Sequence, residues 1–168
     1  PVVVREEFAD VPVEAAGATD WEDLSSAVID DLPCLVIADT GDNPRKRDYA
    51  TLYIVEEPEL AAAVPARVVR TLHFTYEDGP QNCEALAVSP DDRMFYLVSR
   101  GNKSQRKLYE LSFTGAIARM VTPLDTPSVT AMDISRDGRY AVLLTQAAAI
   151  EYRRAADEYG PGRGDMRL

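Results

Sequence analysis

Acidic, amide and basic side chains gather at the ends of short apolar runs, where a β-protein can present them to a ligand. The candidate ligand-binding residues are Asp20, Glu22, Asp39, Asp42, Asn43, Arg47, Asn82, Glu84 and Arg100. Carboxylate and amide oxygens suit a hard cation such as Ca²⁺, which takes about 6 to 8 oxygen ligands. Glu22, Asp42 and Glu84 are the predicted metal ligands. A bound calcium ion would in turn hold a phosphate or polarise an ester carbonyl.

The same side chains also have a purely structural interpretation. Residues 39–43 read Asp-Thr-Gly-Asp-Asn and lack the spacing of an EF-hand loop, so no local motif requires a metal. Glu22 and Glu84 can instead accept hydrogen bonds from backbone amides, or pair with the arginines that follow the strands, and thereby fix neighbouring sheets together. Both roles, structural and ligand-binding, stay open from the sequence alone.

A repeated segment indicates which elements position these residues. Residues 84–99 align without a gap with residues 130–145, at a constant offset of 46. Each copy contains an apolar run, a Ser-x-Asp-x-Arg turn and a second apolar run, which is typical of a β-hairpin. A repeat of this length indicates the blade of a β-propeller. Glu22 and Glu84 occupy the same register in their copies, whereas Thr130 takes that register in the third and interrupts the ring of carboxylates.

The alternation of apolar and polar residues predicts strands and almost no helix. The expected strands are 2–8, 20–28, 34–39, 51–55, 68–76, 83–88, 94–99, 107–113, 117–121, 129–135, 140–145 and 149–153, and the only helical candidate is 58–64. The predicted fold class is all-β, of the β-propeller type, with about three blades of four-stranded antiparallel sheet. We assign the blades to residues 20–76, 82–121 and 129–153, with a leading strand at 2–8 and a flexible tail at 155–168.

Three blades make an incomplete ring, because closed propellers typically have about four to eight. The unpaired edges of such a fragment are prone to pairing with other chains. The sequence therefore predicts one of two partners. Either the remainder of a longer parent chain completes the ring, or a homo-oligomer does, with the strand 2–8 closing the last blade of a second copy.

Charge limits the other partners. The formal net charge of −10 would repel phosphate groups, so we expect neither nucleic acid nor an anionic membrane surface as a partner. No apolar run approaches the roughly 20 residues that span a bilayer.

The cysteines and the single histidine offer little chemistry. Cys34 and Cys83 lie in apolar surroundings without CxxC spacing, and we expect buried free thiols, with a disulfide and a metal site as alternatives. His73 lies in an alternating run and is interpreted as a strand residue. A Ser-His-Asp triad within this chain is therefore not expected.

Spaced motifs along the chain also indicate a family. These are residues 20–24, 41–43, 57–58, 78–80, 82–86, 129–135 and 137–139. Together they resemble a family of uncharacterised bacterial β-propeller proteins, often secreted, and more distantly the phytase-like and esterase-like propellers. The resemblance covers roughly residues 17–152. It implies the propeller fold, an extracellular or periplasmic location and a longer parent protein, and it implies no particular activity.

Two functions from different classes follow as hypotheses. The first is a non-catalytic binding or scaffold module, with an acidic site on the channel face for a small ligand, a partner or a cation. The alternative is a calcium-assisted hydrolase of phosphoesters or carboxylic esters, by analogy with the distant propellers. The first is favoured because the chain has no G-x-S-x-G motif, a single histidine and an interrupted acidic ring.

Overall fold

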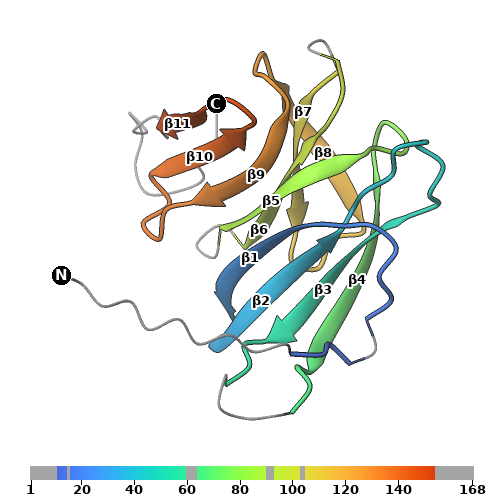
Figure 1. The fold of residues 1–168 in the computed structure, drawn as a ribbon, viewed down its shortest axis with the longest axis vertical. Coiled ribbons are helices and arrows are strands. Elements are labelled where there is room, and N and C mark those ends of the chain that lie inside the picture. The colour runs from blue at the N-terminus through green and yellow to red at the C-terminus, as the bar shows by residue number, and fades with distance from the viewer. Residues whose placement is uncertain (1–10, 15, 60–63, 90–92, 103–104, 154–168) are drawn as a thin grey trace.

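The computed structural model describes residues 11–14, 16–59, 64–89, 93–102 and 105–153 (Figure 1). Within these ranges the chain forms 11 strands and no helix, so the all-β prediction is confirmed. None of the described segments is a helix long and apolar enough to cross a membrane. The expected strand 2–8, the tail 155–168 and most of the helical candidate 58–64 lie outside the described residues.

The strands form three consecutive antiparallel groups, and each strand lies within two residues of its predicted position. The first group is β1 (Trp21–Ile29), β2 (Leu32–Asp39), β3 (Ala50–Glu56) and β4 (Val68–Tyr76). The second is β5 (Cys83–Ser89), β6 (Met94–Ser99), β7 (Lys107–Ser112) and β8 (Ile117–Pro123). The third is β9 (Val129–Ile134), β10 (Tyr140–Thr145) and β11 (Ala149–Arg153).

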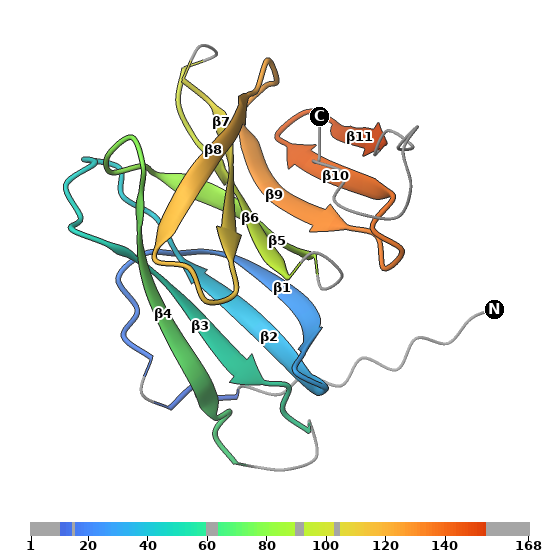
Figure 2. The same cartoon turned by 180° about the vertical axis from the view of Figure 1, so that it is seen from behind.

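The prediction of about three separate blades is not reproduced in this form. The outer strands β4 and β8 pair in parallel at Thr75 with Ile117 and at Tyr76 with Ala118. This short contact joins the first two groups into one eight-stranded sheet, in the order β1-β2-β3-β4-β8-β7-β6-β5, which curls until β1 lies beside β5. The result is a nearly closed, barrel-like sheet with a separate three-stranded sheet beside it (Figures 1 and 2).

Local sequence explains the tight connections within the groups. Asp30 and Asp31 both have positive φ, 52° and 64°, and join β1 to β2 by a two-residue turn. Aspartate tolerates this conformation better than most residues, and its twist suits a hairpin. The predicted turn between β9 and β10 places Gly138 at φ 66°, and its amide donates to the Ser135 carbonyl at 2.8 Å.

Two apolar clusters hold the three groups together. One fills the space between β1–β4 and β5–β8 and includes Phe74, Phe95 and Tyr109. The other packs β9–β11 against the opposite face of β5–β8 and includes Val98, Met132 and Leu143. The strands β1, β5 and β9 thereby come together in the middle of the molecule (Figure 2).

The cysteine and histidine predictions hold. Cys34 and Cys83 are buried free thiols in the first cluster. His73 lies in β4, where its Nδ1 and the Thr51 hydroxyl are 3.1 Å apart.

Candidate functional site

The first strand of each group carries a β-bulge at the same position of the repeat. In β1 the pairing with β2 passes from Trp21 to Asp23 and omits Glu22. The pairing of β5 with β6 omits Glu84, and that of β9 with β10 omits Thr130. A bulge inserts an extra residue and changes the direction of its side chain. The register predicted from the repeat is therefore correct, and it places Glu22 and Glu84 at equivalent bulges of neighbouring strands.

Glu22 lies in a strongly acidic environment at this junction. Burial, followed by the charges of Glu84 and Asp20, raises the pKa of Glu22 to about 7, and the charge of Arg100 opposes the rise. The Glu22 carboxylate forms no hydrogen bond or ion pair with the described residues. Glu22 is therefore the group in this cluster whose charge changes near neutral pH.

The Asp20 carboxylate, like that of Glu22, makes no hydrogen bond or ion pair with the described residues, and Gly41 leaves space for both carboxylates. A methyl group at this position would lie 2.5 Å from Glu22 Oε1 and would collide with the Asp20 carboxylate as well. The Gly41 amide donates to the Asp20 carbonyl at 3.1 Å, which holds the loop after β2 against the start of β1. The Asp20 and Glu22 carboxylates consequently lie side by side on the backbone of Gly41.

Glu84, by contrast, is paired. Its Oε1 accepts hydrogen bonds from Arg100 Nη1 at 2.7 Å and from Asn82 Nδ2 at 3.1 Å. Only 9% of the Glu84 side chain is exposed, whereas 48% of the Arg100 side chain is. Asn82 also accepts the Asp42 amide at 2.6 Å and approaches Asn43 Oδ1 at 3.4 Å. Asn82 thus links the loop after β2 to the start of β5.

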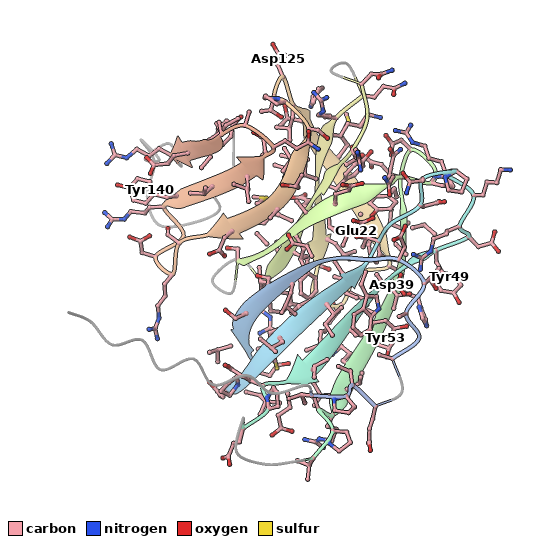
Figure 3. The ribbon with its side chains drawn as sticks, in the orientation of Figure 1. Glu22, Asp39, Tyr49, Tyr53, Asp125 and Tyr140 are labelled. Atoms are coloured by element: carbon pink, nitrogen blue, oxygen red, sulfur yellow. The ribbon has the colours of Figure 1, made fainter. Side chains whose placement is uncertain are left out.

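Asp39, Asp42 and Arg47 hold the loop between β2 and β3 in shape. Asp39 accepts the amides of Thr19 and Asp20 and an ion-pair hydrogen bond from Arg47 Nη1 at 2.8 Å. Asp42 accepts the amides of Lys46 and Arg47, and Arg47 also donates to the Gly41 carbonyl. Figure 3 shows Glu22 and Asp39 on the same side of the molecule, far from Tyr140 on β10.

The nine predicted residues therefore divide into two sets. The first set forms the acidic site, in which Asp20 and Glu22 lie beside Gly41 without a partner among the described residues; its members are Asp20, Glu22, Asn82, Glu84 and Arg100. The other four, Asp39, Asp42, Asn43 and Arg47, shape and anchor the adjoining loop. Among the described residues no group of three or more His, Cys, Asp or Glu side chains is placed to hold a metal ion. Calcium binding by Glu22, Asp42 and Glu84 stays a prediction.

Asp23, which the candidate set omits, has a structural role beside the site. Its Oδ2 accepts the amides of Leu86 on β5 at 2.8 Å and of Met132 on β9 at 3.4 Å. Leu86 and Met132 are 46 residues apart and are equivalent in the repeat. Burial raises the pKa of Asp23, and the three backbone amides around it oppose the rise. Asp23 thereby links the three central strands β1, β5 and β9. The equivalent positions of Leu86 and Met132 in the repeat are the sequence feature that could have indicated a shared partner.

Comparison with known proteins adds no further constraint on this site. No family model, no curated protein and no solved structure matches the chain.

Proposed function

We propose that the protein is a non-catalytic binding module whose acidic site, formed by Asp20, Glu22 and Glu84, takes a cationic group. The observation that carries this proposal is that the Asp20 and Glu22 carboxylates lie together beside Gly41 and make no hydrogen bond or ion pair with other described residues. Close carboxylates without a counter-charge repel each other, and this repulsion contributes to the raised pKa of Glu22. A bound cation relieves that repulsion, and this relief contributes to the affinity of the site for the cation.

The surroundings favour binding over reaction. Glu84 is neutralised by Arg100, and the nearby Asp39 and Asp42 carboxylates are occupied by backbone amides and by Arg47. The site thus consists of a fixed frame with two carboxylates, Asp20 and Glu22, that have no partner among the described residues. This arrangement suits an ammonium or guanidinium group, which donates several hydrogen bonds. The net charge of −10 adds a long-range attraction for such ligands.

Calorimetric titration tests the proposal with three probes: ethylammonium, ethylguanidinium and Ca²⁺. At least one is expected to bind at pH 8, and binding is expected to weaken by roughly tenfold at pH 6 as Glu22 takes up a proton. Glu22→Gln should abolish binding, whereas Glu151→Gln on the exposed strand β11 should leave it unchanged. Equal affinity in the wild type and in Glu22→Gln would refute the proposal.

One observation favours an enzymatic alternative. A carboxyl group with a pKa of about 7 is matched to general acid or base work at neutral pH, and the paired Glu84 beside Glu22 gives two carboxyls in different environments. This pattern supports a hydrolase of phosphoesters or carboxylic esters. Assays with nitrophenyl phosphate and nitrophenyl acetate, with and without chelator, test it. Turnover that disappears in Glu22→Gln but persists in Glu151→Gln would establish the alternative.

We further propose that the three groups of strands are consecutive blades of a β-propeller. The common bulge at Glu22, Glu84 and Thr130 and the adjacency of β1, β5 and β9 support it. The resemblance to secreted bacterial propellers, with the extracellular or periplasmic location that it implies, belongs to the same proposal. So does completion of the ring by a second copy or by more of a parent chain. Light scattering tests the homo-oligomer, since a stable monomer of 18.5 kDa would exclude completion by self-association.

A further inference from the structure

A cavity of about 180 Å³ lies between the loop after β2 and the connection from β4 to β5. Its walls come from residues 40, 42 and 47–50 on one side and from residues 75, 76 and 79–81 on the other. Since one water needs about 10–15 Å³ by this kind of measure, the space suits a molecule of roughly ten non-hydrogen atoms. Figure 3 shows Tyr49 at this edge of the molecule.

Two residues in the wall are almost fully buried, and each carries a polar atom that has no hydrogen-bond partner among the described residues. Gln81 is 6% exposed, and its Nε2 donates to Asp78 Oδ1 and to the Gly79 carbonyl, both at 3.3 Å. Its Oε1 accepts no hydrogen bond from the described residues. The Tyr76 hydroxyl, also in a residue 6% exposed, has no hydrogen-bond partner in the described structure. It lies near the Cys83 thiol, but without the geometry of a hydrogen bond. Of these two atoms the Tyr76 hydroxyl is the buried one, and buried polar atoms without partners are rare in native proteins.

The two more deeply placed charges in the wall, Arg47 and Asp42, already have partners, whereas the third, Asp48, is exposed to solvent. The Arg47 guanidinium pairs with Asp39 through Nη1, and the Asp42 carboxylate accepts the amides of residues 46 and 47. Arg47 keeps further N–H donors that make no other hydrogen bond in the described structure. An uncharged ligand with both a donor and an acceptor is therefore the chemical match for the interior of the cavity, since the only charge there without a partner among the described residues, Asp48, is exposed to solvent.

Part of the remaining wall is aromatic and apolar. Tyr49 stands edge-on to His73, with ring centroids 4.6 Å apart, and Ala50 and Pro80 add apolar surface. Asp78 keeps Gln81 in position while it also accepts hydrogen bonds from the Tyr109 hydroxyl and from Lys107. Flat apolar surface beside fixed polar atoms is typical of sites for planar ring compounds.

We propose that this cavity binds a small, uncharged, planar amide or lactam, whose N–H donates to Gln81 Oε1 and whose carbonyl accepts from Arg47. The Tyr76 hydroxyl contributes a further hydrogen bond to the occupant. This site is separate from the cation site at Asp20 and Glu22, and its occupation does not depend on Glu22.

Amide NMR spectra of the full chain, titrated with uracil and with benzamide, test the proposal. Toluene serves as the apolar control and benzylamine as the cationic one. We expect uracil or benzamide to bind with millimolar affinity and to shift signals of residues 40–50 and 75–81. Toluene is expected to bind at least fivefold more weakly, because it leaves Gln81 Oε1 unpaired. If neither amide shifts these signals, or if toluene binds as well as they do, the proposal fails.

Variants locate the binding. Thr75→Trp would fill the cavity from the exposed face of β4 and should abolish amide binding, whereas Thr71→Trp on the same strand should preserve it. Gln81→Met and Tyr76→Phe remove the unpartnered polar atoms and should each weaken binding by at least fivefold in a protein whose spectrum stays dispersed. Binding that survives both Thr75→Trp and Gln81→Met would overturn the assignment. Glu22→Gln should leave uracil binding intact, so this result is independent of the cation site.

Discussion

Arg100 donates a hydrogen bond of 2.7 Å to the Glu84 carboxylate, whereas the neighbouring Glu22 carboxylate has no such partner in the part of the chain that the structure describes. Both glutamates lie at the same bulge of their repeats. One basic side chain thus divides two equivalent carboxylates into a neutralised one and a free one. This asymmetry is the basis of the proposed site.

Removal of the Arg100 charge should therefore act on Glu22. In Arg100→Met the pKa of Glu22 is expected to rise further, because the variant lacks the guanidinium charge that lowers this pKa in the wild type. The free energy of unfolding should fall by no more than about 1 kcal/mol, since the pair is half exposed on the arginine side. Carboxyl-detected NMR gives the pKa, and urea denaturation gives the stability. A fall in the pKa of Glu22 would contradict the arrangement.

Gly41→Ala should disrupt the acidic site directly. The added methyl group would collide with the carboxylates of Asp20 and Glu22, so cation binding should disappear and stability should fall by on the order of 1–3 kcal/mol. Gly17→Ala is the matched control, because its methyl group would meet only the Tyr53 hydroxyl at 3.6 Å. Unchanged cation affinity in Gly41→Ala would show that these two carboxylates are not the binding groups.

Asp39 is expected to matter for stability far more than its exposed neighbours. Asp39→Ala removes an ion pair whose carboxylate is buried and the acceptor for two amides just before β1, at a cost of about 3 kcal/mol. Asp48→Ala, on the same loop but exposed, should change stability by less than about 0.5 kcal/mol. Urea unfolding of the two variants measures the difference, and equal values would argue against the anchoring role of Asp39.

The pH dependence of stability should report on Glu22. A carboxyl group whose pKa rises from 4.5 in the unfolded chain to about 7 in the folded protein favours folding at low pH. Its contribution is fully present below pH 4.5 and is lost as the pH rises through 7. Relative to Glu22→Gln, the wild type should therefore lose stability across this interval. Urea midpoints of both proteins at intervals of half a pH unit test this, and parallel curves would contradict it.

The repeat predicts the strands, turns and bulges, because a β-hairpin is determined by residues close together in the sequence. The run around Glu84 and its counterpart around Thr130 fix strand positions, turns and even the bulge register. The pairing of Thr75 with Ile117, by contrast, depends on how two outer strands converge in space, and no local pattern encodes it. The sequence therefore predicts the strands correctly but not the barrel-like closure of the first eight.

The candidate site shows the same limit. Ligand-type residues were identified by type and by place in the repeat, and they do gather at one edge. Which of them are free depends on hydrogen bonds across long sequence separations, such as the contact of Asn82 with the Asp42 amide. Asp42 carries a carboxylate, as Glu22 does, yet its carboxylate accepts hydrogen bonds from the amides of residues 46 and 47. The cavity beside Gln81 left no sign in the sequence, because its two walls come from separate connections.

The most direct measurement is the titration of the Glu22 carboxyl group by NMR, in the free protein and with ethylammonium, ethylguanidinium or Ca²⁺ present. The cation-binding account predicts a pKa of about 7 in the free protein and a lower value with the cation that binds, because a bound positive charge favours the carboxylate. A pKa near the ordinary 4.5 that none of the three cations changes would contradict it.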